Sequence, residues 1–275
     1  MPEMPEVEAY KRYISSHCLH KKIKDVSISQ KRLIKKGSTD FKKDLVGSTF
    51  TNVQREGKYV VIAVSSDYKL VMHFGLTGFV VVAKAGEKVK YSCVAFTFDN
   101  NKTLHWCDIR KFGKIWLVKS IDEVKGLKDL GPDPLKLSYA AFLKIVKENE
   151  RKNIKSFLMD QSIIAGIGNE YSDEILFQAG IDPHHKIKDL SAGQIKKTYA
   201  HMRAILRYAT NLRIKNSKKL GKQQWFSADD DTQFKSAYLI THRHTDHRCP
   251  KNNSHTLKKA TIGGRSSYYC PIDQK

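Results

Sequence analysis

The sequence lacks the marks of several classes of protein. It has no uninterrupted apolar run of about 18 residues, the length that a membrane-spanning helix requires. Its first residues, MPEMPEVEAY, hold glutamates and prolines in place of the basic start and apolar stretch of a secretory signal peptide. The five cysteines are odd in number and scattered, which argues against a disulfide framework. We therefore expect an intracellular protein from a reducing compartment, with no membrane segment.

Acidic residues are scarce beside basic ones. The chain has 28 aspartates and glutamates against 49 lysines and arginines, a formal net charge of +21. A globular protein of this charge usually binds a polyanion, although solvated lysines can also serve solubility alone. The 275 residues suffice for two modest domains, and a hydrophobic content of 40% is enough to form a core.

The residue pattern divides the chain at 131–134. Before this point, an apolar stripe at helical spacing predicts a helix over 6–18 that faces a core. From about 45 to 118, short β-branched and aromatic segments such as KYVVIAV and KLVMHF predict an all-β unit, in the form of a sandwich. Two prolines within GPDP at 131–134 forbid a continuous helix or central strand, so we place a domain boundary there.

Beyond the boundary the pattern is helical. Ser138 is placed to cap one helix, and Ser191 with Gln194 forms a possible capping box before a helix that runs to about Leu212. Between them, IAGIGNEYSDEILFQAG reads as a glycine-bearing turn followed by a short helix. The polar residues 213–233 predict a loop.

The first residues of the chain suggest covalent chemistry. Removal of Met1 before a proline would leave Pro2 as a free secondary amine, which can attack a sugar carbon and form an iminium ion. An α-amino group titrates near pH 8, so a useful fraction is unprotonated at neutrality. The neighbouring Glu3 can act as an acid that protonates the opening sugar ring. The alternative is that PEMPE is only an extended segment leading into a helix.

Several segments resemble the formamidopyrimidine-DNA glycosylase and endonuclease VIII family, in the family's order and over nearly the whole chain. They are MPEMPEVE at 1–8, REGKYVVI around Lys58, HFGLTG at 73–78, DIRKFG at 108–113, LGPDPL at 130–135, LMDQSIIAGIGNEYSDEILFQAGIDP at 158–183 and GGRSSYYCP at 263–271. None is decisive alone, but together they leave little room for coincidence.

The resemblance implies catalytic roles. Pro2 would be the nucleophile and Glu3 the general acid. Lys58, in a β-hairpin turn, would hold a phosphate near the lesion and assist elimination, or else be a solvated turn lysine. Arg265 would grip the phosphates that flank the lesion, which arginine can do with two hydrogen bonds. Glu6 would help to fix the active-site pocket, or would be an acid favoured in the first turn of a helix.

Other residues would bind DNA, by the same resemblance. A base inside a duplex must be flipped out to reach the nucleophile, and the hole that it leaves must be filled. Leu76, where the oxidised-purine branch usually has methionine, would fill this hole with Arg110 and Phe112, although core packing could also explain the two apolar residues. Lys155 would point toward the damaged base or its phosphate, or be a solvated helix lysine.

The turn at Gly166 and Gly168 would let a phosphate approach the N-terminus of the next helix. There Asn169 would donate to the DNA backbone and also cap the helix.

The C-terminal segment departs from the family. Its usual zinc finger has two Cys-x-x-Cys knuckles, whereas here they read Cys249-Pro-Lys-Asn and Cys270-Pro-Ile-Asp. A mixed zinc site of Cys249, His255, Cys270 and Asp273 is one interpretation, and His247 could replace His255. The other interpretation is a metal-free hairpin that keeps the shape of the finger by packing.

We therefore predict an α+β multidomain fold: an N-terminal β-sandwich with a flanking helix, a helix–two-turn–helix domain and a C-terminal β-hairpin resembling a zinc finger. The expected domains are 2–130, 135–233 and 234–275. DNA should lie in a basic cleft between them. No cofactor is required for catalysis, and a structural zinc stays open.

The resemblance implies a monomeric, DNA-associated glycosylase and AP lyase, acting by β,δ-elimination on double-stranded DNA with oxidised bases or abasic sites. MPEMPEVE and REGKYVV favour formamidopyrimidine and 8-oxoguanine as the bases removed. The stretch 213–233 lacks the family's usual pattern for the loop that caps a flipped base, which leaves base preference open. The alternatives are an endonuclease VIII-like enzyme for oxidised pyrimidines and a non-catalytic protein that binds damaged DNA.

Overall fold

The structure is a computed structural model that describes residues 1–35, 37, 40–219 and 248–275. These residues form two compact units, each described here by itself. Unit 1 comprises Met1–Asp129 and resumes at Thr210, and unit 2 comprises Leu130–Ala209 and the C-terminal residues. The described residues include no helix that is long and apolar enough to cross a membrane.

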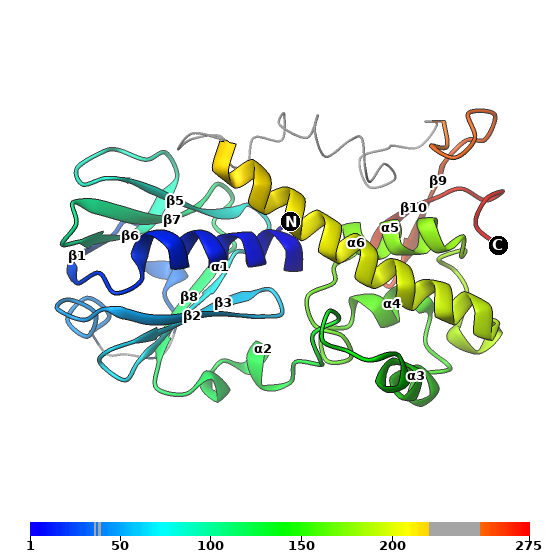
Figure 1. Cartoon of the computed structure of the whole chain (residues 1–275), viewed down its shortest axis with the longest axis horizontal. Coiled ribbons are helices and arrows are strands. Elements are labelled where there is room, and N and C mark those ends of the chain that lie inside the picture. Colours follow the sequence, from blue (N-terminus) through cyan, green and yellow to red (C-terminus); the bar gives the residue numbers. More distant parts are fainter. Residues whose placement is uncertain (36, 38–39, 220–247) are drawn as a thin grey trace. The chain divides into compact units, whose positions relative to one another are not determined.

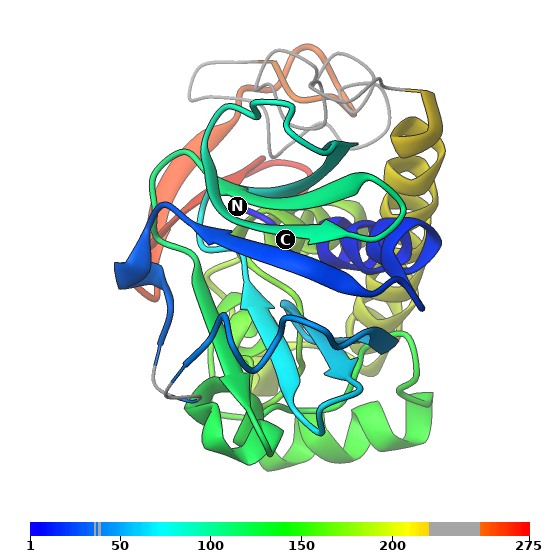
Figure 2. The same ribbon diagram turned by 90° about the vertical axis from the view of Figure 1, so that its left-hand side faces the viewer.

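Unit 1 contains a sandwich of two four-stranded antiparallel sheets, which Figure 2 shows as separate layers. One sheet has the order β1-β6-β7-β5 and the other β2-β3-β4-β8. The strands are β1 (Ile23–Ile28), β2 (Phe50–Glu56), β3 (Tyr59–Val64), β4 (Lys69–His73), β5 (Gly78–Lys84), β6 (Ser92–Phe98), β7 (Lys102–Asp108) and β8 (Lys114–Val118). The apolar faces of both sheets bury one large cluster that includes Phe50, Phe96 and Trp106. The sandwich expected from the sequence is confirmed.

Helix α1 (Met4–Cys18) closes one side of the sandwich (Figure 1). It contacts β2 and β3 of one sheet and β5 of the other. Its apolar stripe, which includes Val7, Tyr10 and Ile14, is fully buried in the sandwich core. The chain then passes through a 3-10 turn at Ile121–Glu123 and the short α2 (Lys125–Lys128) to the end of this part of unit 1.

Unit 2 is helical, with α3 (Tyr139–Glu148), α4 (Ile154–Met159), α5 (Asn169–Ala179) and the first part of α6 (Ala192–Lys219). The predicted caps are confirmed: Ser138 Oγ accepts from the backbone N–H of Ala141, and Ser191 and Gln194 exchange the two bonds of a capping box. Helix α6 runs further than expected, to Lys219, and its last part packs in unit 1 from Thr210 onward.

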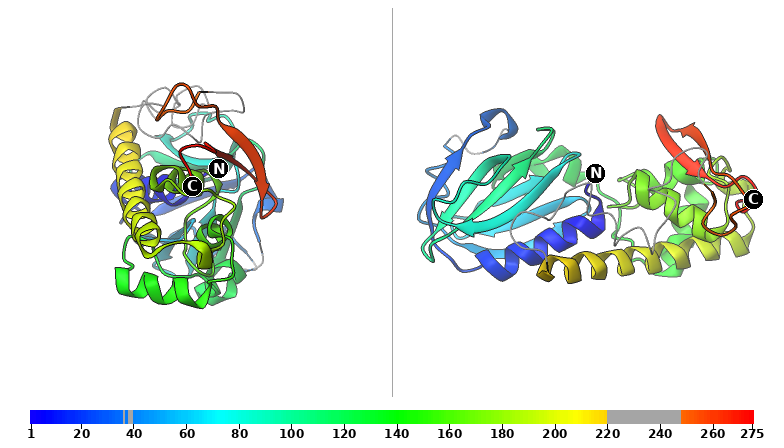
Figure 3. Two further views of the ribbon diagram at one scale, coloured as in Figure 1. Left: turned by 90° about the vertical axis from the view of Figure 1, so that its right-hand side faces the viewer. Right: turned by 90° about the horizontal axis from the view of Figure 1, so that it is seen from above.

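A two-stranded antiparallel hairpin, β9 (Lys258–Ile262) and β10 (Arg265–Tyr269), follows α6 after residues outside the described ranges. Strand β10 packs beside α5, as both views of Figure 3 show. The expected loop at 213–233 lies outside the described residues from 220, and so do His247 and the boundary at 234. The division into three domains stays a prediction.

Candidate active site

The N-terminal segment of unit 1 is buried and held by a carboxylate. Pro2 is buried and Glu3 has no exposed surface. Oε2 of Glu6 accepts from the backbone N–H of Glu3 at 3.0 Å, and Oε1 accepts from Nε of Arg213 at 3.0 Å. Glu6 therefore links the backbone beside Pro2 to α6, more than 200 residues along the chain. A carboxylate with an arginine partner fixes this segment better than the helix dipole alone would.

The turn that carries Lys58 is tied to α1. Glu56 and Tyr59 pair across β2 and β3, which leaves Gly57 and Lys58 as a two-residue turn. The buried guanidinium of Arg55 donates to Oε2 of Glu8 on α1 at 3.2 Å and to the carbonyl oxygen of Gly57 at 3.1 Å. The ion pair thus positions the half-buried Lys58 relative to the helix that begins after Glu3.

His73, at the end of β4, adds a neutral group beside this lysine. Burial, with smaller contributions from the charges of Lys58 and Lys114, lowers the pKa of His73 from 6.5 to about 4. Its Nδ1 accepts from the backbone N–H of Gly75 at 3.3 Å, so Nε2 carries the proton of the neutral ring. The ring therefore offers a hydrogen-bond donor close to a cation, a combination suited to phosphate.

A buried carboxylate organises the loop at 108–113. Asp108 is fully buried, and its Oδ1 accepts from the hydroxyl of Thr77 at 2.6 Å and from the backbone N–H of Arg110 at 3.2 Å. Its Oδ2 accepts from the backbone N–H of Gly113 at 2.6 Å. Lys111 adopts a left-handed backbone conformation, with φ of 57°. Asp108 thus closes a tight loop whose side chains are directed outward.

The three residues predicted to fill the gap left by a flipped base lie on two adjoining turns. Phe112 is 54% exposed although it is a large apolar residue, and the guanidinium of Arg110 lies 5.1 Å above its ring. A Cβ on Gly75 would come within 2.6 Å of the backbone at Phe112, so the turn that carries the half-buried Leu76 touches this loop. Core packing therefore does not explain Phe112.

The turn before α5 in unit 2 differs in one respect from expectation. Gly166 has φ of 97°, and its backbone N–H donates to Oε1 of Gln161 at 2.9 Å. Gly168 is the N-cap of α5 and Asn169 is its first helical residue, so the expected role of Asn169 as the cap is wrong. Within the described part of the chain, Oδ1 of Asn169 is buried without a hydrogen-bond partner. Glycine leaves the backbone of this helix N-terminus open to close approach, which suits an anion.

Lys155 takes neither of the positions expected for it. It is fully buried in α4, and its Nζ lies 2.7 Å from Oδ1 of Asp173 and 3.1 Å from the carbonyl oxygen of Ser266. Asp173 also accepts from the hydroxyl of Ser267 at 2.6 Å and from the backbone N–H of Tyr268 at 3.3 Å. The lysine therefore joins α4, α5 and β10, and it neither faces solvent nor points outward to a ligand.

Arg265 follows the turn of this hairpin and begins β10. Gly263 and Gly264 both have positive φ, and a Cβ on Gly263 would come within 2.8 Å of Oγ of Ser156 in α4. The hairpin turn thus lies against α4, while the side chain of Arg265 is exposed. The buried network at Asp173 holds the strand on which this arginine stands.

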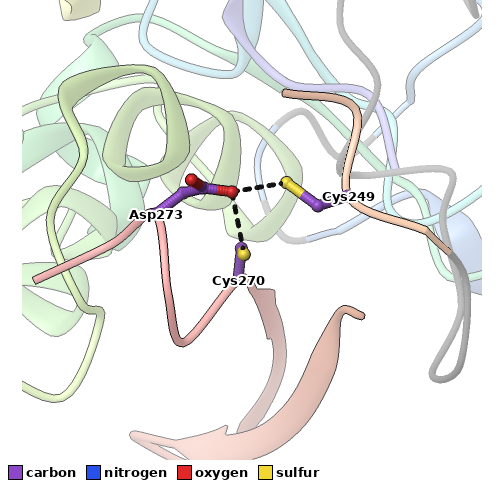
Figure 4. Close-up of side chains that lie close together, drawn as sticks. All are labelled: Cys249, Cys270 and Asp273. Atoms are coloured by element: carbon purple, nitrogen blue, oxygen red, sulfur yellow. Dashed lines mark hydrogen bonds between the residues drawn. The ribbon is translucent and has the colours of Figure 1, made fainter. Parts of the chain in front are cut away.

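Three of the four predicted metal ligands, Cys249, Cys270 and Asp273, lie together at the base of the hairpin (Figure 4). Oδ2 of Asp273 lies 3.0 Å from Sγ of Cys249, 3.1 Å from Sγ of Cys270 and 2.9 Å from Nδ1 of His255. Both cysteines are fully buried. Burial, and then the hydrogen bond to Asp273, raise the pKa of Cys249 to about 11, so the thiol keeps its proton at neutral pH unless a metal displaces it.

The chain is similar to characterised proteins over its full length. The profile of the formamidopyrimidine-DNA glycosylase N-terminal domain matches residues 1–115, and the profile of the H2TH domain of the same glycosylase matches residues 130–219. A formamidopyrimidine-DNA glycosylase from Pelotomaculum thermopropionicum is 33% identical over 100% of this chain and 99% of its own length. The chain belongs to the formamidopyrimidine-DNA glycosylase family.

Solved structures of this family share the fold. The wild-type Lactococcus lactis Fpg in complex with N7-benzyl-Fapy-dG DNA matches with a TM-score of 0.85 and 26% identity, over the whole of both chains. The Lactococcus lactis Fpg in complex with abasic-site DNA matches with a TM-score of 0.83 and 25% identity, over 99% of each chain. The α+β architecture expected for a formamidopyrimidine-DNA glycosylase is therefore confirmed.

The structure groups the predicted site residues by unit. Those of unit 1 are Pro2, Glu3, Lys58, Leu76, Arg110 and Phe112, and those of unit 2 are Lys155, Asn169, Arg265, Cys249, His255, Cys270 and Asp273. Sequence reasoning missed the supporting residues of this glycosylase-family site, which are His73, Asp108, Asp173 and Arg213. His73 and Asp108 begin the family segments HFGLTG and DIRKFG, so position within a motif could have indicated them. Nothing in the sequence pairs Arg213 with Glu6 or Asp173 with Lys155.

Proposed function

We propose that this chain excises oxidised bases from duplex DNA and then cleaves the strand at the abasic site, with Pro2 as nucleophile. The observation that carries the proposal is the buried pair Pro2 and Glu3, held in place by Glu6 and Arg213. Removal of Met1 is required, because the nitrogen of Pro2 is an amide while Met1 is attached.

In this mechanism the Pro2 nitrogen attacks C1′ of the damaged nucleotide. The C1′–base bond breaks, and the base leaves with the bonding electron pair and a proton. The sugar ring opens as Glu3 gives a proton to O4′, and the nitrogen lone pair forms the iminium. Loss of a C2′ proton expels the 3′ phosphate by β-elimination, and loss of a C4′ proton then expels the 5′ phosphate by δ-elimination. Water then hydrolyses the iminium and restores the amine.

The remaining residues of unit 1 support DNA binding around this chemistry. Lys58 and the neutral His73 offer a cation and a donor for a phosphate. Phe112 and Arg110 are exposed on a loop held by Asp108, which suits a wedge that enters the base stack and an arginine that meets the orphaned base. Leu76 would fill space beside them. In unit 2, Arg265 and the N-terminus of α5 with Asn169 are the proposed contacts to phosphates.

Oxidised purines, namely formamidopyrimidine and 8-oxoguanine, are the proposed substrates. The full-length similarity to proteins named formamidopyrimidine-DNA glycosylase supports this over oxidised pyrimidines. The same full-length similarity to proteins named as glycosylases supports an enzyme over a purely binding role. We propose further that the protein acts as a monomer wherever the cell keeps its DNA, in the cytoplasm, the nucleoid or the nucleus.

Borohydride trapping tests the proposal. The protein is incubated with a duplex that holds one 8-oxoguanine, or one abasic site, in the presence of borohydride, which reduces an iminium to a stable amine. We expect a covalent protein–DNA adduct, and a peptide map that places it on Pro2 with Met1 absent. Glu3→Gln should abolish base excision, and Glu148→Gln, a matched change on the exposed face of α3, should not. Strand cleavage without an adduct, or full excision by Glu3→Gln, would reject the mechanism.

A further inference from the structure

The turn that carries Leu76 is anchored at both ends. The backbone N–H of Gly78 donates to the carbonyl oxygen of Phe74 at 2.8 Å, which closes the turn. The fully buried Tyr10 of α1 packs its ring against Phe74, with the ring centroids 4.6 Å apart, and donates its hydroxyl to the carbonyl oxygen of Gly78 at 3.4 Å. Both ends of the turn are therefore fixed to α1, and the position of its tip depends on other contacts.

The tip of this turn contacts the neighbouring loop on both sides of Leu76. Before it, Gly75 has φ of 56°, and a Cβ there would come within 2.6 Å of the backbone of Phe112. After it, the hydroxyl of Thr77 lies 2.6 Å from Oδ1 of Asp108. The backbone of Leu76 is thus held between two contacts with one loop, the loop that presents the other two residues predicted to fill the gap.

The hydroxyl of Thr77 closes a small ring of hydrogen bonds. It donates to Oδ1 of Asp108 at 2.6 Å and accepts from the backbone N–H of Arg110 at 2.9 Å, and the same N–H approaches Oδ1 of Asp108 at 3.2 Å. A hydroxyl group can donate and accept at the same time, whereas a methyl group can do neither. A bond of 2.6 Å from a hydroxyl to a carboxylate is in the range of strong, charge-assisted hydrogen bonds. Thr77 therefore links its own turn to the backbone that carries Arg110.

The side chain of Leu76 depends on this link more than a methionine would. Leucine is branched and has fewer rotatable bonds than the methionine usual in the oxidised-purine branch, so it can adjust its reach less. The place that its methyl groups occupy is therefore decided by where the backbone is held. Residues from two separate segments fill one gap in a base stack only if the segments keep a fixed position relative to each other.

We propose that Thr77 is a positioning residue that holds Leu76, Arg110 and Phe112 as one rigid body, so that the three side chains enter the gap left by a flipped base together. This role rests on the proposed function, because it serves the flipping of a damaged base. Two unlinked segments would each have to be ordered on the DNA, and a link made before binding removes part of that entropic cost. Loss of the hydroxyl should therefore weaken the insertion step and leave the phosphate contacts unchanged.

Hydrogen exchange of the full chain without DNA, followed at single amides by NMR, tests the link itself. In Thr77→Val and in Thr77→Ala, the amide of Arg110 loses an acceptor and should exchange about tenfold faster, whereas the amide of Gly113 keeps its carboxylate partner and should not change. Thr77→Ser keeps the hydroxyl and should exchange like the unchanged protein.

A matched control is Thr51→Val on the other sheet, which removes a hydroxyl that donates to the carbonyl oxygen of Ala63 at 3.2 Å. This change should leave the exchange of the Arg110 amide as it is. If the Arg110 amide exchanged equally fast in Thr77→Val, in Thr77→Ala and in the unchanged protein, the proposal would be overturned.

A fluorescent base tests whether the side chains enter the gap together. 2-Aminopurine is placed beside a tetrahydrofuran abasic analogue, which has no base to excise, and its fluorescence reports the rate at which the neighbouring base unstacks. Leu76→Ala and Phe112→Ala should each slow this step, and the double variant should lose at least about threefold less than the product of the two single losses. In the Thr77→Val background the two losses should multiply, because the two segments then act independently.

The length of the side chain gives a second arm of this experiment. Thr77→Val should slow unstacking less in the Leu76→Met background, because a longer and more flexible side chain still reaches the gap. An equal loss with leucine and with methionine would overturn the dependence of Leu76 on the link.

Failure of this proposal and failure of the proposed function give different results. A protein that neither unstacks nor cleaves a lesion duplex would reject the proposed function, and with it any role of Thr77 in base flipping, even where hydrogen exchange shows the link. A protein that cleaves the duplex but shows independent losses at Leu76 and Phe112 in the presence of Thr77 would reject the coupling alone.

Discussion

Two buried aspartates support the two segments that present exposed arginines, and their partners differ. Asp108, below the loop with Arg110, accepts from three neutral groups of the described residues: a hydroxyl and two backbone N–H groups. Asp173, beside the strand with Arg265, accepts from a hydroxyl and a backbone N–H but also faces the ammonium group of Lys155 at 2.7 Å. Asp108 closes the loop between β7 and β8, which are consecutive in sequence but lie in different sheets. Asp173 instead joins α4 and α5 to β10, whose Ser267 is 94 residues away in the sequence.

The partners of the two aspartates differ because the apolar clusters beside the two segments differ in size. The loop with Arg110 connects β7 and β8 of a sandwich whose core buries residues from both sheets and α1. The hairpin with Arg265 has a small apolar cluster of its own, so polar contacts must fix its position. A buried ion pair adds little net stability over an apolar pair, but it is strongly directional and costly to break. Charged contacts therefore fix the hairpin, whereas the sandwich core fixes the strands that flank the loop with Arg110.

Removal of the charge on Lys155 should cause the largest loss of stability. Lys155→Met leaves the Asp173 carboxylate buried without its cation, which should lower the free energy of unfolding of unit 2 by about 3–5 kcal/mol. Hydrogen exchange of the β10 amides in the full chain would measure this loss. Lys155→Met combined with Asp173→Leu should recover much of it, because no unpaired charge remains. If the single variant and the unchanged protein had equal exchange rates, the ion pair of Lys155 and Asp173 would not be what fixes the hairpin.

Acid should next destabilise unit 1 through His73. The pKa of this histidine is about 4 in the folded protein and 6.5 as its ordinary value, so folding favours the neutral ring. The stabilisation is complete above pH 6.5 and is lost as the pH falls toward 4, by about 3 kcal/mol. Urea unfolding between pH 7 and pH 4 would measure the loss, and His73→Asn should show a smaller one. Parallel curves for the two proteins would contradict the lowered pKa of His73.

Asp108→Asn should lower the free energy of unfolding by less than Lys155→Met does. An amide keeps one acceptor oxygen but turns an NH₂ group toward a backbone or hydroxyl donor, which should cost about 1–3 kcal/mol. The sandwich should stay folded, and the amides of residues 109–113 should exchange faster while those of β7 do not. A loss as large as that of Lys155→Met would mean that neutral and charged partners support the two segments equally.

The smallest expected effect is on the salt dependence of DNA binding. Substitution of the two arginines should change this dependence differently. On the proposed function, Arg265→Ala removes a phosphate contact, so the slope of log affinity against log salt should become shallower by about 1. Arg110→Ala should leave this slope unchanged and alter the preference for the base opposite the lesion. Binding of a lesion duplex at several salt concentrations separates the two. A slope made equally shallow by both variants would place both arginines on phosphates.

Local patterns allowed the architecture to be predicted. The β-branched segments and the caps at Ser138 and at Ser191 with Gln194 act over a few residues, and the structure contains them. Strand β1 lies outside the predicted all-β region of 45–118, because charged and polar residues interrupt the apolar pattern of IKDVSI. The cap before α5 was assigned one residue too late, since Gly168 and Asn169 are both favourable at an N-cap.

The sequence by itself determined the chemical groups of this protein: the order of its family segments, the proline and glutamate at its start and the donor types left at its C-terminal knuckles. Only the tertiary structure decided their partners. Lys155 reads as a surface lysine until Asp173 and Ser266 are found beside it, 18 and 111 residues away. Glu6 and Arg213 are 207 residues apart. A side chain's type is local information, but its burial and its partner depend on which distant segments the core brings together.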